Sequence, residues 1–414
     1  MKILVCGASG FIGRAICERL TRAGHEVVRG VRVPVFSNDV AIDFRVDTAV
    51  EGWLPRVRGI DIVINAVGII TESHAARFED VHFRAPTALF EACAKAGVQR
   101  IIQISSLGAD TGDTAYFRSK RAADEVLMRL PVEWQILYPS LVYGQNGVSA
   151  SMFRALASLP VIPVPALVGV EYRPIHIDDL TEAVESAISP ATPPRQRIEC
   201  VGASRINYKD MLDCYRQGMH LPPPRWLTIP APLMALAAKI GTLIPGAKLT
   251  PETLRMLRQG NVGDTKHLSA LLDRAPLAID DFIAPDEAEL LRHRAHAAWR
   301  LPLLRGALAV VWILTAFISL CVYPTSESLG LLNEVGLTGE MAKIALYGAA
   351  LLDLSMGIAC LARPSRALWA IQGALVLGYS IIIAVAMPRF LTHPFGPLLK
   401  NIPILAILFI LLTE

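Results

Sequence analysis

The sequence has few charged residues, and they are unevenly distributed. Asp, Glu, Lys and Arg make up 19% of its 414 residues, and the mean hydropathy is +0.42. Soluble domains carry a charged share nearer to about 25%. The chain has 77 charged side chains, 40 basic and 37 acidic, and residues 301–414 hold only 11 of them. This composition excludes a disordered chain and argues against a protein that is soluble over its whole length.

The sequence also lacks the patterns of a metal-binding or disulfide-rich protein. None of its seven cysteines forms a Cys-x-x-Cys pair, and no cluster of His and Cys has metal-ligand spacing. We therefore expect free thiols and no metal. The net charge of +3 is too small and dispersed to indicate a nucleic-acid partner. Met1 and Lys2 lead directly into the apolar run Ile3–Cys6 without a signal-peptide pattern, so we expect residues 1–300 to remain in the cytoplasm.

Long apolar runs dominate the C-terminal part. Three are long enough to cross roughly 30 Å of hydrocarbon as helices, and a fourth is shorter. They cover residues 306–323, 344–362, 367–387 and 397–413. These runs predict a transmembrane bundle of about four helices over residues 306–414, joined through a basic linker, residues 291–305, to a domain formed by residues 1–290. The lipid bilayer is thus an expected partner.

The basic residues near these runs predict an orientation. Four arginines lie in residues 292–305 and two more between the second and third runs, whereas three glutamates lie between the first and second. The excess of arginine favours a multi-pass protein of the inner (cytoplasmic) membrane whose N-terminal domain faces the cytoplasm. Asp353 is a lone acid inside the second run. It is either a functional group or an acceptor of hydrogen bonds from a neighbouring helix.

A glycine motif follows the first apolar run. Strand-like residues 2–6 meet Gly7-x-x-Gly10-x-x-Gly13, and a helical pattern follows. In this context Gly7 permits a tight turn, Gly10 lets the backbone approach a pyrophosphate, and Gly13 lets helix and strand pack closely. The phosphates then lie at the helix N-terminus, where free N–H groups point at them. The cofactor-binding candidates here are Gly7, Ser9, Gly10, Phe11, Ile12 and Gly13.

The next strand favours one cofactor over another. An acid at its end would bind the ribose 2′-hydroxyl of NAD, but residues 28–32 read Val-Arg-Gly-Val-Arg. Arg32 offers a planar set of donors to a 2′-phosphate, whereas Arg29 alone reads as a solvated charge. We therefore favour NADP(H), with NAD(H) as the alternative, and we expect Asp43 to reach the adenine.

A tyrosine and a lysine share one helix face. Tyr116 and Lys120 are four residues apart. An ammonium group close to a tyrosine stabilises the phenolate, which lets the pair exchange a proton with a carbonyl or carbinol while hydride moves to or from a nicotinamide. The alternative is a packed aromatic ring and a solvated charge. Three strand ends surround the pair in sequence, at residues 65–68, 105–106 and 139–144.

The order of these motifs resembles the short-chain dehydrogenase/reductase superfamily, in its extended or atypical, NAD-dependent epimerase/dehydratase-like branch. It is similar to the group that includes the NAD(P)H-binding accessory subunit of respiratory complex I. The resemblance implies an α/β fold with a Rossmann-type doubly wound parallel sheet. It also implies that Tyr116 is the acid/base, that Lys120 orients the ribose and that Ser106 polarises the carbonyl. Further cofactor contacts are Ala66, Gly68 and Pro139. The C-terminal part resembles the DoxX-like membrane module.

Three positions depart from the family pattern. The family often has its catalytic Ser or Thr at the position of Leu107, an Asn at that of His82, and an Arg at that of Tyr138. Fold and cofactor binding therefore carry over more safely than catalysis.

Residues 145–290 are expected to build the substrate side. We expect His176 to be a structural residue, and Asp178 and Asp179 to cap a helix that begins near Leu180. The apolar stretch 226–243 predicts a cap packed on the Rossmann core; the alternative is a surface that faces lipid or a lipophilic substrate.

Taken together, these patterns favour a membrane-anchored NAD(P)H-dependent oxidoreductase that acts on a carbonyl or alcohol of a lipophilic substrate. One alternative is a non-catalytic, cofactor-binding structural or assembly factor of a membrane protein complex. Another is a sugar-nucleotide epimerase or dehydratase. In a further interpretation the membrane module, with Asp353, carries the function.

Overall fold

The computed structural model describes residues 1–243, 249–394 and 396–414. The chain divides into two compact units, Met1–Ala295 and His296–Glu414. The boundary falls inside the segment predicted as a basic linker, residues 291–305. This segment is helical throughout, because α11 runs from Ala288 to Phe317. Residues 244–248 of the predicted substrate side lie outside the described part.

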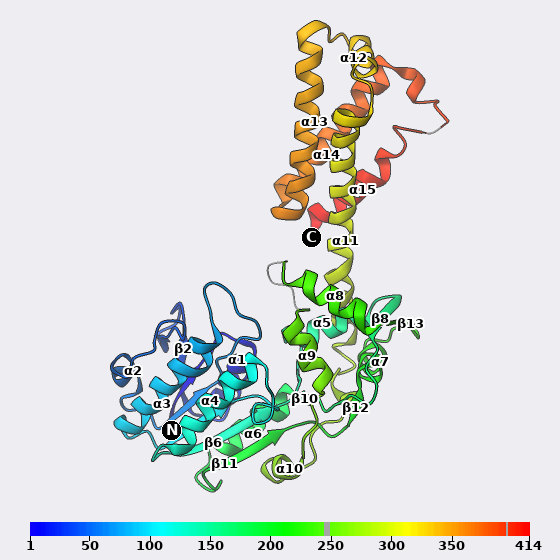
Figure 1. The fold of residues 1–414 in the computed structure, drawn as a ribbon. Helices are drawn as coiled ribbons and strands as arrows, with labels where there is room; N and C mark the ends of the chain where they lie inside the picture. The colour runs from blue at the N-terminus through cyan, green and yellow to red at the C-terminus, as the bar shows by residue number, and fades with distance from the viewer. Residues whose placement is uncertain (244–248, 395) are drawn as a thin grey trace. The chain divides into compact units, whose positions relative to one another are not determined.

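A seven-stranded parallel sheet organises the first unit (Figure 1). Its order is β11-β6-β5-β4-β1-β2-β3, and every neighbouring pair is parallel. The strands are β1 (Lys2–Cys6), β2 (Glu26–Val31), β3 (Asp39–Ala41), β4 (Ile62–Asn65), β5 (Arg100–Ile104), β6 (Glu133–Pro139) and β11 (Gln196–Cys200). Strand order reverses between β1 and β4, which is where doubly wound sheets bind ligands, beyond the carboxyl ends of the strands. The predicted Rossmann-type sheet is confirmed.

Helices cover both faces of this sheet. They are α1 (Phe11–Arg22), α2 (Val50–Val57), η1 (Glu79–Arg84), α3 (Ala85–Ala96), α4 (Ala115–Arg129) and α6 (Ile177–Ala187). Alternate strand residues enter two separate cores, because successive side chains point to opposite faces. Leu4 and Val63 pack with α2, α3 and α4, whereas Ile3 and Ile64 pack with α1 and α6.

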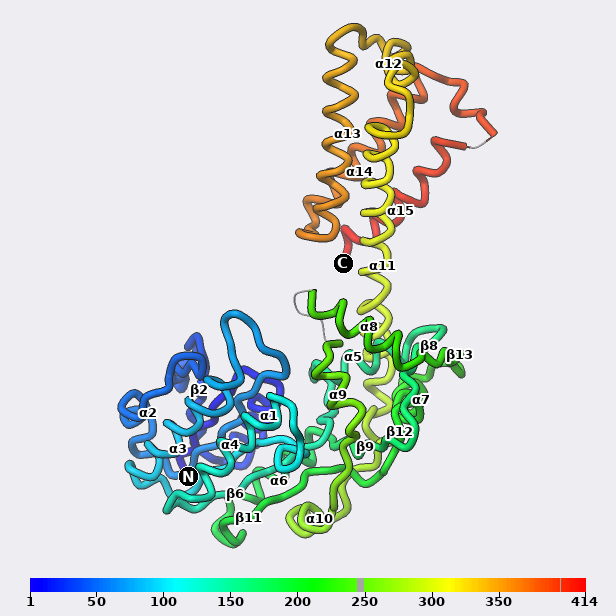
Figure 2. Tube along the Cα trace, viewed as in Figure 1, coloured from blue at the N-terminus to red at the C-terminus, as the bar shows by residue number. Residues whose placement is uncertain are grey.

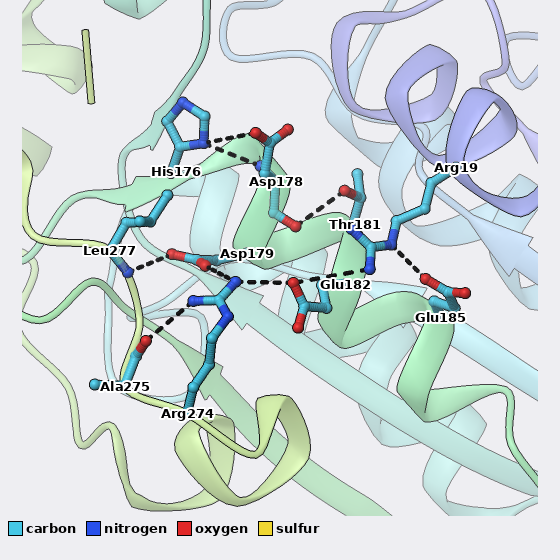
Figure 3. A network of polar contacts seen from close by, with 10 residues as sticks. All are labelled: Arg19, His176, Asp178, Asp179, Thr181, Glu182, Glu185, Arg274, Ala275 and Leu277. Carbon is cyan, nitrogen blue, oxygen red and sulfur yellow. Dashed lines mark hydrogen bonds and ion pairs between the residues drawn. The ribbon is translucent and has the colours of Figure 1, made fainter. Parts of the chain in front are cut away.

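A polar network fixes α6 (Figure 3). Arg19 of α1 pairs with Glu185, and Arg274 pairs with the fully buried Asp179 at 2.7 Å. Our expectation that Asp178 or Asp179 caps this helix was wrong. The ring Nδ1 of His176 accepts the Asp178 N–H at 3.3 Å and is the cap, so the helix begins at Ile177. Asp179 instead accepts the N–H of Leu277. His176 is structural.

The remainder of the first unit forms a third core beside the sheet. Three two-stranded ribbons and several helices make up this part of the unit, and the helix Lys266–Leu272 packs instead in the core that contains α1 and α6. They are β7 (Val142–Tyr143), α5 (Val148–Ala157), β8 (Val161–Pro165), β9 (Glu171–Tyr172), β10 (Ile175–His176), β12 (Ile206–Asn207), α7 (Tyr208–Gly218), β13 (Arg225–Ile229), α8 (Ala231–Gly241), α9 (Pro251–Gln259), α10 (Lys266–Leu272) and η2 (Ile279–Asp281). Trp226 packs on this core, as expected of a cap. For α8 the expectation of a packed cap was wrong, because only Ala238 and Gly241 of this helix are buried.

The second unit is a helical bundle. Its elements are the later part of α11, η3 (Ile318–Val322), α12 (Thr325–Glu334), α13 (Gly339–Ala362), α14 (Arg366–Ala386), η4 (Pro388–Phe390) and α15 (Asn401–Thr413). Among the described residues, three helices are long and apolar enough to cross a membrane: Ala288–Val322, Gly339–Ala362 and Arg366–Ala386. The fourth predicted helix, α15, has 13 residues and a length of about 20 Å.

Polar groups and a close approach join the helices of this bundle. The Trp312 ring N–H donates to the fully buried Gln372 at 3.0 Å. A side chain on Gly357 would press on the Ala309 carbonyl oxygen at 3.1 Å, so α13 and α11 touch through small residues. Asp353 is 7% exposed, and within the described residues its Oδ1 has no hydrogen-bond partner.

Candidate cofactor and active site

The glycine turn between β1 and α1 is shaped for a diphosphate. Gly7 has a φ of +83°, and its carbonyl oxygen accepts the Gly10 N–H at 2.9 Å. A Cβ on Gly13 would fall inside van der Waals contact of the Gly7 carbonyl. Gly10 caps α1 without a side chain, and Ser9 and Gly10 are exposed, so N–H groups of the first helical turn are open to an anion. Phe11 and Ile12 start the helix and are partly buried.

A cavity of about 320 Å³ lies beside this turn. Its lining includes Ser9, Arg29, Arg32, Phe36, Asp39 and Arg45. Arg29 is engaged rather than solvated, since it lies 3.4 Å from Asp39 and over the Phe36 ring at 4.8 Å. Arg32 is exposed, as is Arg45, which the sequence analysis missed. Two arginines from different segments therefore converge on the end of β2.

Asp43 forms an ion pair with Arg45. Both oxygens of its carboxylate accept from the guanidinium, with Nε distances of 2.8 and 3.0 Å. This side-chain hydrogen bonding lowers the pKa of Asp43. Asp43 thus orients Arg45 at the cavity, and its predicted contact with an adenine stays a prediction.

Tyr116 and Ser106 meet at the carboxyl end of β5. Tyr116 lies in the first turn of α4, which Thr114 caps through the Phe117 N–H. Ser106 lies beside the Tyr116 phenol, and its hydroxyl acts to lower the pKa of that phenol. Leu107, at the alternative family position, is 8% exposed and packs in the core, so Ser106 is the group that faces Tyr116. The Tyr116 ring is enclosed edge-to-face by Phe78, His82 and Phe117.

The pKa of Tyr116 departs from our expectation of a lowered value. Burial raises it, the Ser106 hydrogen bond opposes this, and the charge of Asp124 adds to it. Lys120 does not stabilise the phenolate here because its ammonium points to backbone oxygens, that of Ile104 at 3.1 Å and that of Val67 at 3.4 Å. Burial lowers the pKa of Lys120 to about 8.

Lys120 is well placed for a ligand at the switch point between β1 and β4. A Cβ on Gly68 would lie 3.2 Å from its Nζ, so this buried ammonium lies directly beneath the exposed Gly68. Ala66 and Val67 pack against Gly7, since a Cβ placed on Gly7 would contact both residues at 3.1–3.2 Å. Pro139 ends the neighbouring strand β6, and its oxygen accepts the Leu107 N–H at 2.9 Å.

Asp124, which the sequence analysis also missed, is a buried carboxylate one turn beyond Lys120. It is 2% exposed and accepts hydrogen bonds from Ser105 and from the Gln103 amide at 3.4 Å. Burial raises the pKa of Asp124 to about 6, against the hydrogen bonds and the charge of Lys120. Tyr138, where the family pattern has an arginine, lies beside this carboxylate and acts to lower its pKa.

This pKa predicts a pH dependence of stability. A carboxyl whose folded pKa is raised from 3.8 to about 6 stabilises the fold below pH 3.8, and this contribution is lost as pH rises through about 6. Its size is on the order of 2–3 kcal/mol. We expect the thermal unfolding midpoint of the wild type in detergent to decrease, relative to that of Asp124→Asn, as the pH rises from 4 to 6. Above pH 6 the difference between the two proteins should stay constant. A constant difference from pH 4 to 8 would contradict the assignment.

His82 occupies the position where the family pattern has an asparagine. It lies in η1, a π-helix, and its Nε2 accepts the Ile69 N–H at 3.0 Å. Its Nδ1 lies 2.9 Å from the Ser119 hydroxyl, which donates to the Tyr116 carbonyl oxygen. Burial and Lys120 hold its pKa well below the usual range, so the ring is neutral with the proton on Nδ1. His82 therefore ties the strand end after β4 to α4.

A second cavity, of about 640 Å³, adjoins the start of α4. Leu107, Gly108 and Phe117 line one side, and residues 169–171 and 258–262 line another. Helix α9 closes onto the site from this side, because the Glu252 carboxylate accepts the Tyr116 N–H at 3.0 Å. No group of three metal-ligating side chains occurs among the residues that the structure describes.

The chain is similar to known proteins in both units. Residues 3–190 match the NAD dependent epimerase/dehydratase family, and residues 309–409 match the DoxX-like family. One relative is the "NADH-ubiquinone oxidoreductase 40 kDa subunit, mitochondrial" of Neurospora crassa, 27% identical over 244 residues, which cover 55% of this chain and 64% of that protein. The chain thus spans less than two thirds of that relative.

A second relative and a solved structure match more of their own lengths. The "Ceramide reductase" of Caulobacter vibrioides is 25% identical over 285 residues, 67% of this chain and 87% of that protein. The Escherichia coli quinone oxidoreductase QOR2 complexed with NADPH has a TM-score of 0.55 and 17% identity, covering 68% of this chain and 98% of that one. The latter likeness shows the fold alone. The first unit is therefore similar to the NAD dependent epimerase/dehydratase family, and the second unit is similar to the DoxX-like family and contains helices long and apolar enough to cross a membrane.

Proposed function

We propose that this protein is a membrane-anchored reductase that uses NADPH to reduce a carbonyl group of a lipophilic substrate. The observation that carries the proposal is the juxtaposition of Ser106 and Tyr116 at the carboxyl end of β5. It lies at the same edge of the sheet as the glycine turn and the buried Lys120. A proton donor, a carbonyl-polarising hydroxyl and a cofactor cradle are thus assembled at one place.

A protonated Tyr116 is suited to the reductive direction. The cofactor supplies a hydride to the carbonyl carbon, and the carbonyl oxygen needs a proton. Since burial raises the pKa of Tyr116, its phenol holds a proton at neutral pH and donates it. Ser106 donates a hydrogen bond to the carbonyl oxygen and polarises it. The Lys120 ammonium, beside Gly68, would bind the ribose hydroxyls of the cofactor, and the charge of Asp124 favours the charged form of Lys120.

The preference for NADPH rests on Arg32 and Arg45. Both line the cavity at the end of β2, where the 2′-phosphate would lie. We expect Arg32→Ser with Arg45→Ser to weaken NADPH binding by about tenfold or more, since each charge-assisted hydrogen bond contributes about 1.5–3 kcal/mol. NADH binding should change little. Fluorescence titration of both nucleotides checks this, with Arg22→Ser as the control because Arg22 is exposed at the end of α1. An equal loss for both nucleotides would contradict the preference.

Anchoring in a bilayer supports a lipophilic substrate. Substrates of an enzyme held at the membrane reach it by diffusion in the lipid, and one relative carries the name ceramide reductase. The arginines near the first span favour an inner-membrane protein whose Rossmann domain faces the cytoplasm, where NADPH is available.

The test uses the full chain in detergent or nanodiscs. NADPH is titrated by its fluorescence, and its oxidation is followed after membrane lipid extract is added. Binding followed by extract-dependent oxidation supports the reductase and justifies fractionation of the extract. Absence of NADPH binding would overturn the assignment of Gly7, Gly10 and Gly13.

A second candidate is a cofactor-binding subunit or assembly factor of a membrane protein complex. The enclosed Tyr116 ring and the His82 substitution favour it, as does the similarity to a respiratory oxidoreductase subunit. In that case NADPH binds and raises the unfolding temperature, and no lipid fraction promotes its oxidation.

A role carried by the membrane module predicts that Asp353→Asn abolishes function while Tyr116→Phe does not.

A further inference from the structure

Helix α8 exposes its large residues and buries its small ones. Leu233, Leu236 and Ile240 are 56%, 55% and 50% exposed, and Leu243 just beyond the helix is 81% exposed. Ala238 and Gly241 are its buried residues. The four large residues follow a spacing of three and four, so they form one stripe on the helix. A helix that completes a water-facing domain has the opposite arrangement.

The charges near this stripe suit a membrane surface. Residues 225–243 contain no acidic residue, and their two charged side chains are Arg225 and Lys239, both exposed. An apolar helix face flanked by basic groups matches the interface of a bilayer with anionic lipids.

The first unit is joined to the first apolar span by a short segment. The start of α11 belongs to this unit, because Ala288, Leu291 and Ala295 pack in its third core. The uncharged run of the first span begins at Gly306, eleven residues beyond Ala295. Tethering raises the effective concentration of lipid at the unit, so even weak lipid affinity of the stripe is sufficient for contact.

The stripe is also connected to the candidate active site. Helix α8 packs on α9, as Figure 2 shows in green, and the two follow each other in the chain. In the first turn of α9, Glu252 accepts the Tyr116 N–H at 3.0 Å. The C-terminal end of α9 lines the 640 Å³ cavity beside Phe117. One helical pair thus extends from the exposed apolar stripe to the turn that holds Tyr116.

We propose that the stripe formed by Leu233, Leu236, Ile240 and Leu243 inserts into the surface of the lipid bilayer, and that α8 and α9 form the entry for a lipid substrate. The second half of this proposal rests on the proposed reductase function. A lipophilic substrate would then move from the bilayer along α8 and α9 toward the turn that holds Tyr116.

The insertion is tested in the full chain, reconstituted in nanodiscs of phosphatidylcholine and phosphatidylglycerol. In a background with Cys214→Ser and Cys321→Ser, Leu236→Cys is labelled with a polarity-sensitive fluorophore and quenched by lipids that carry a nitroxide near the headgroup. Val46→Cys is the matched control, because Val46 is 72% exposed on the sheet domain. We expect quenching about threefold stronger at position 236 than at 46.

If protein that still binds NADPH showed equal quenching at positions 236 and 46, the stripe would not be inserted in the bilayer. A separate measurement addresses entry. Leu236→Gln with Ile240→Gln should raise the KM for a membrane-embedded carbonyl substrate about tenfold, with kcat and NADPH affinity unchanged. An unchanged KM would overturn the entry route. Because quenching needs no turnover, an inactive protein with strong quenching would refute the reductase function and leave the insertion standing.

Discussion

Replacing Tyr116 by phenylalanine is expected to slow lipid-dependent NADPH oxidation by about 10²–10⁴-fold, the usual contribution of a positioned proton donor. The ring remains in place among Phe78, His82 and Phe117, so the packing of α4 is kept. Only the hydroxyl beside Ser106 is removed. The NADPH dissociation constant should therefore stay within about twofold of wild type, since the glycine turn is left unchanged.

The matched control is Tyr208→Phe, which removes a hydroxyl from a buried tyrosine in the third core, away from the sheet edge. Single-turnover oxidation of bound NADPH gives the rate, and nicotinamide fluorescence gives the affinity. If Tyr116→Phe kept more than about half of the wild-type rate, the tyrosine would have no role as proton donor and the non-catalytic candidate would be favoured.

A methyl group at Gly13 is expected to abolish cofactor binding. The Cβ of Gly13→Ala would overlap the Gly7 carbonyl, so either the glycine turn or α1 must move. Such overpacking costs about 1–3 kcal/mol of stability. It also displaces the N–H groups at the start of α1 that would hold the diphosphate. Binding of NADPH and NADH should fall together, by about 100-fold or more, because both nucleotides share that diphosphate.

Gly52→Ala is the control for this substitution. Gly52 lies inside α2, and a Cβ there would meet nothing within 4 Å. Alanine at that position should stabilise the helix by about 0.5–1 kcal/mol and leave nucleotide binding unchanged. Unfolding midpoints and nucleotide titration on the three proteins separate a loss of fold from a loss of binding. Normal binding by Gly13→Ala would refute the cofactor assignment.

The parts of the fold that the sequence predicted are those encoded locally. The glycine spacing of residues 7–13, the strand patterns and the long apolar runs each depend on a few neighbouring residues. The sheet and the three long membrane helices that they predicted are present. Tyr116 and Lys120 could be singled out because their spacing lies within one helix turn.

The features that sequence analysis missed depend on contacts between distant segments. Arg45 becomes a candidate only because the loop after β3 returns to the end of β2. Asp124 reads as one more polar residue on α4 until Ser105, Gln103 and Tyr138 are seen to surround it. The exposed face of α8 has the same composition as a core helix, so only the structure distinguishes the two. The spacing of Asp39 and Arg29 gave no sign that they would pair across two strands.

The π-helix at Glu79–Arg84 affects how related sequences should be aligned. A π-turn contains one residue more than an α-turn, so this segment accommodates an extra residue without lengthening the helix. Removing one residue here would restore α-helical spacing and turn every side chain before it by about 100° relative to α3. His82 would then no longer meet both the Ile69 N–H and Ser119. In an alignment with relatives that have an unbroken α-helix at this position, a one-residue gap belongs between residues 79 and 84, and a placement elsewhere would pair His82 with the wrong position.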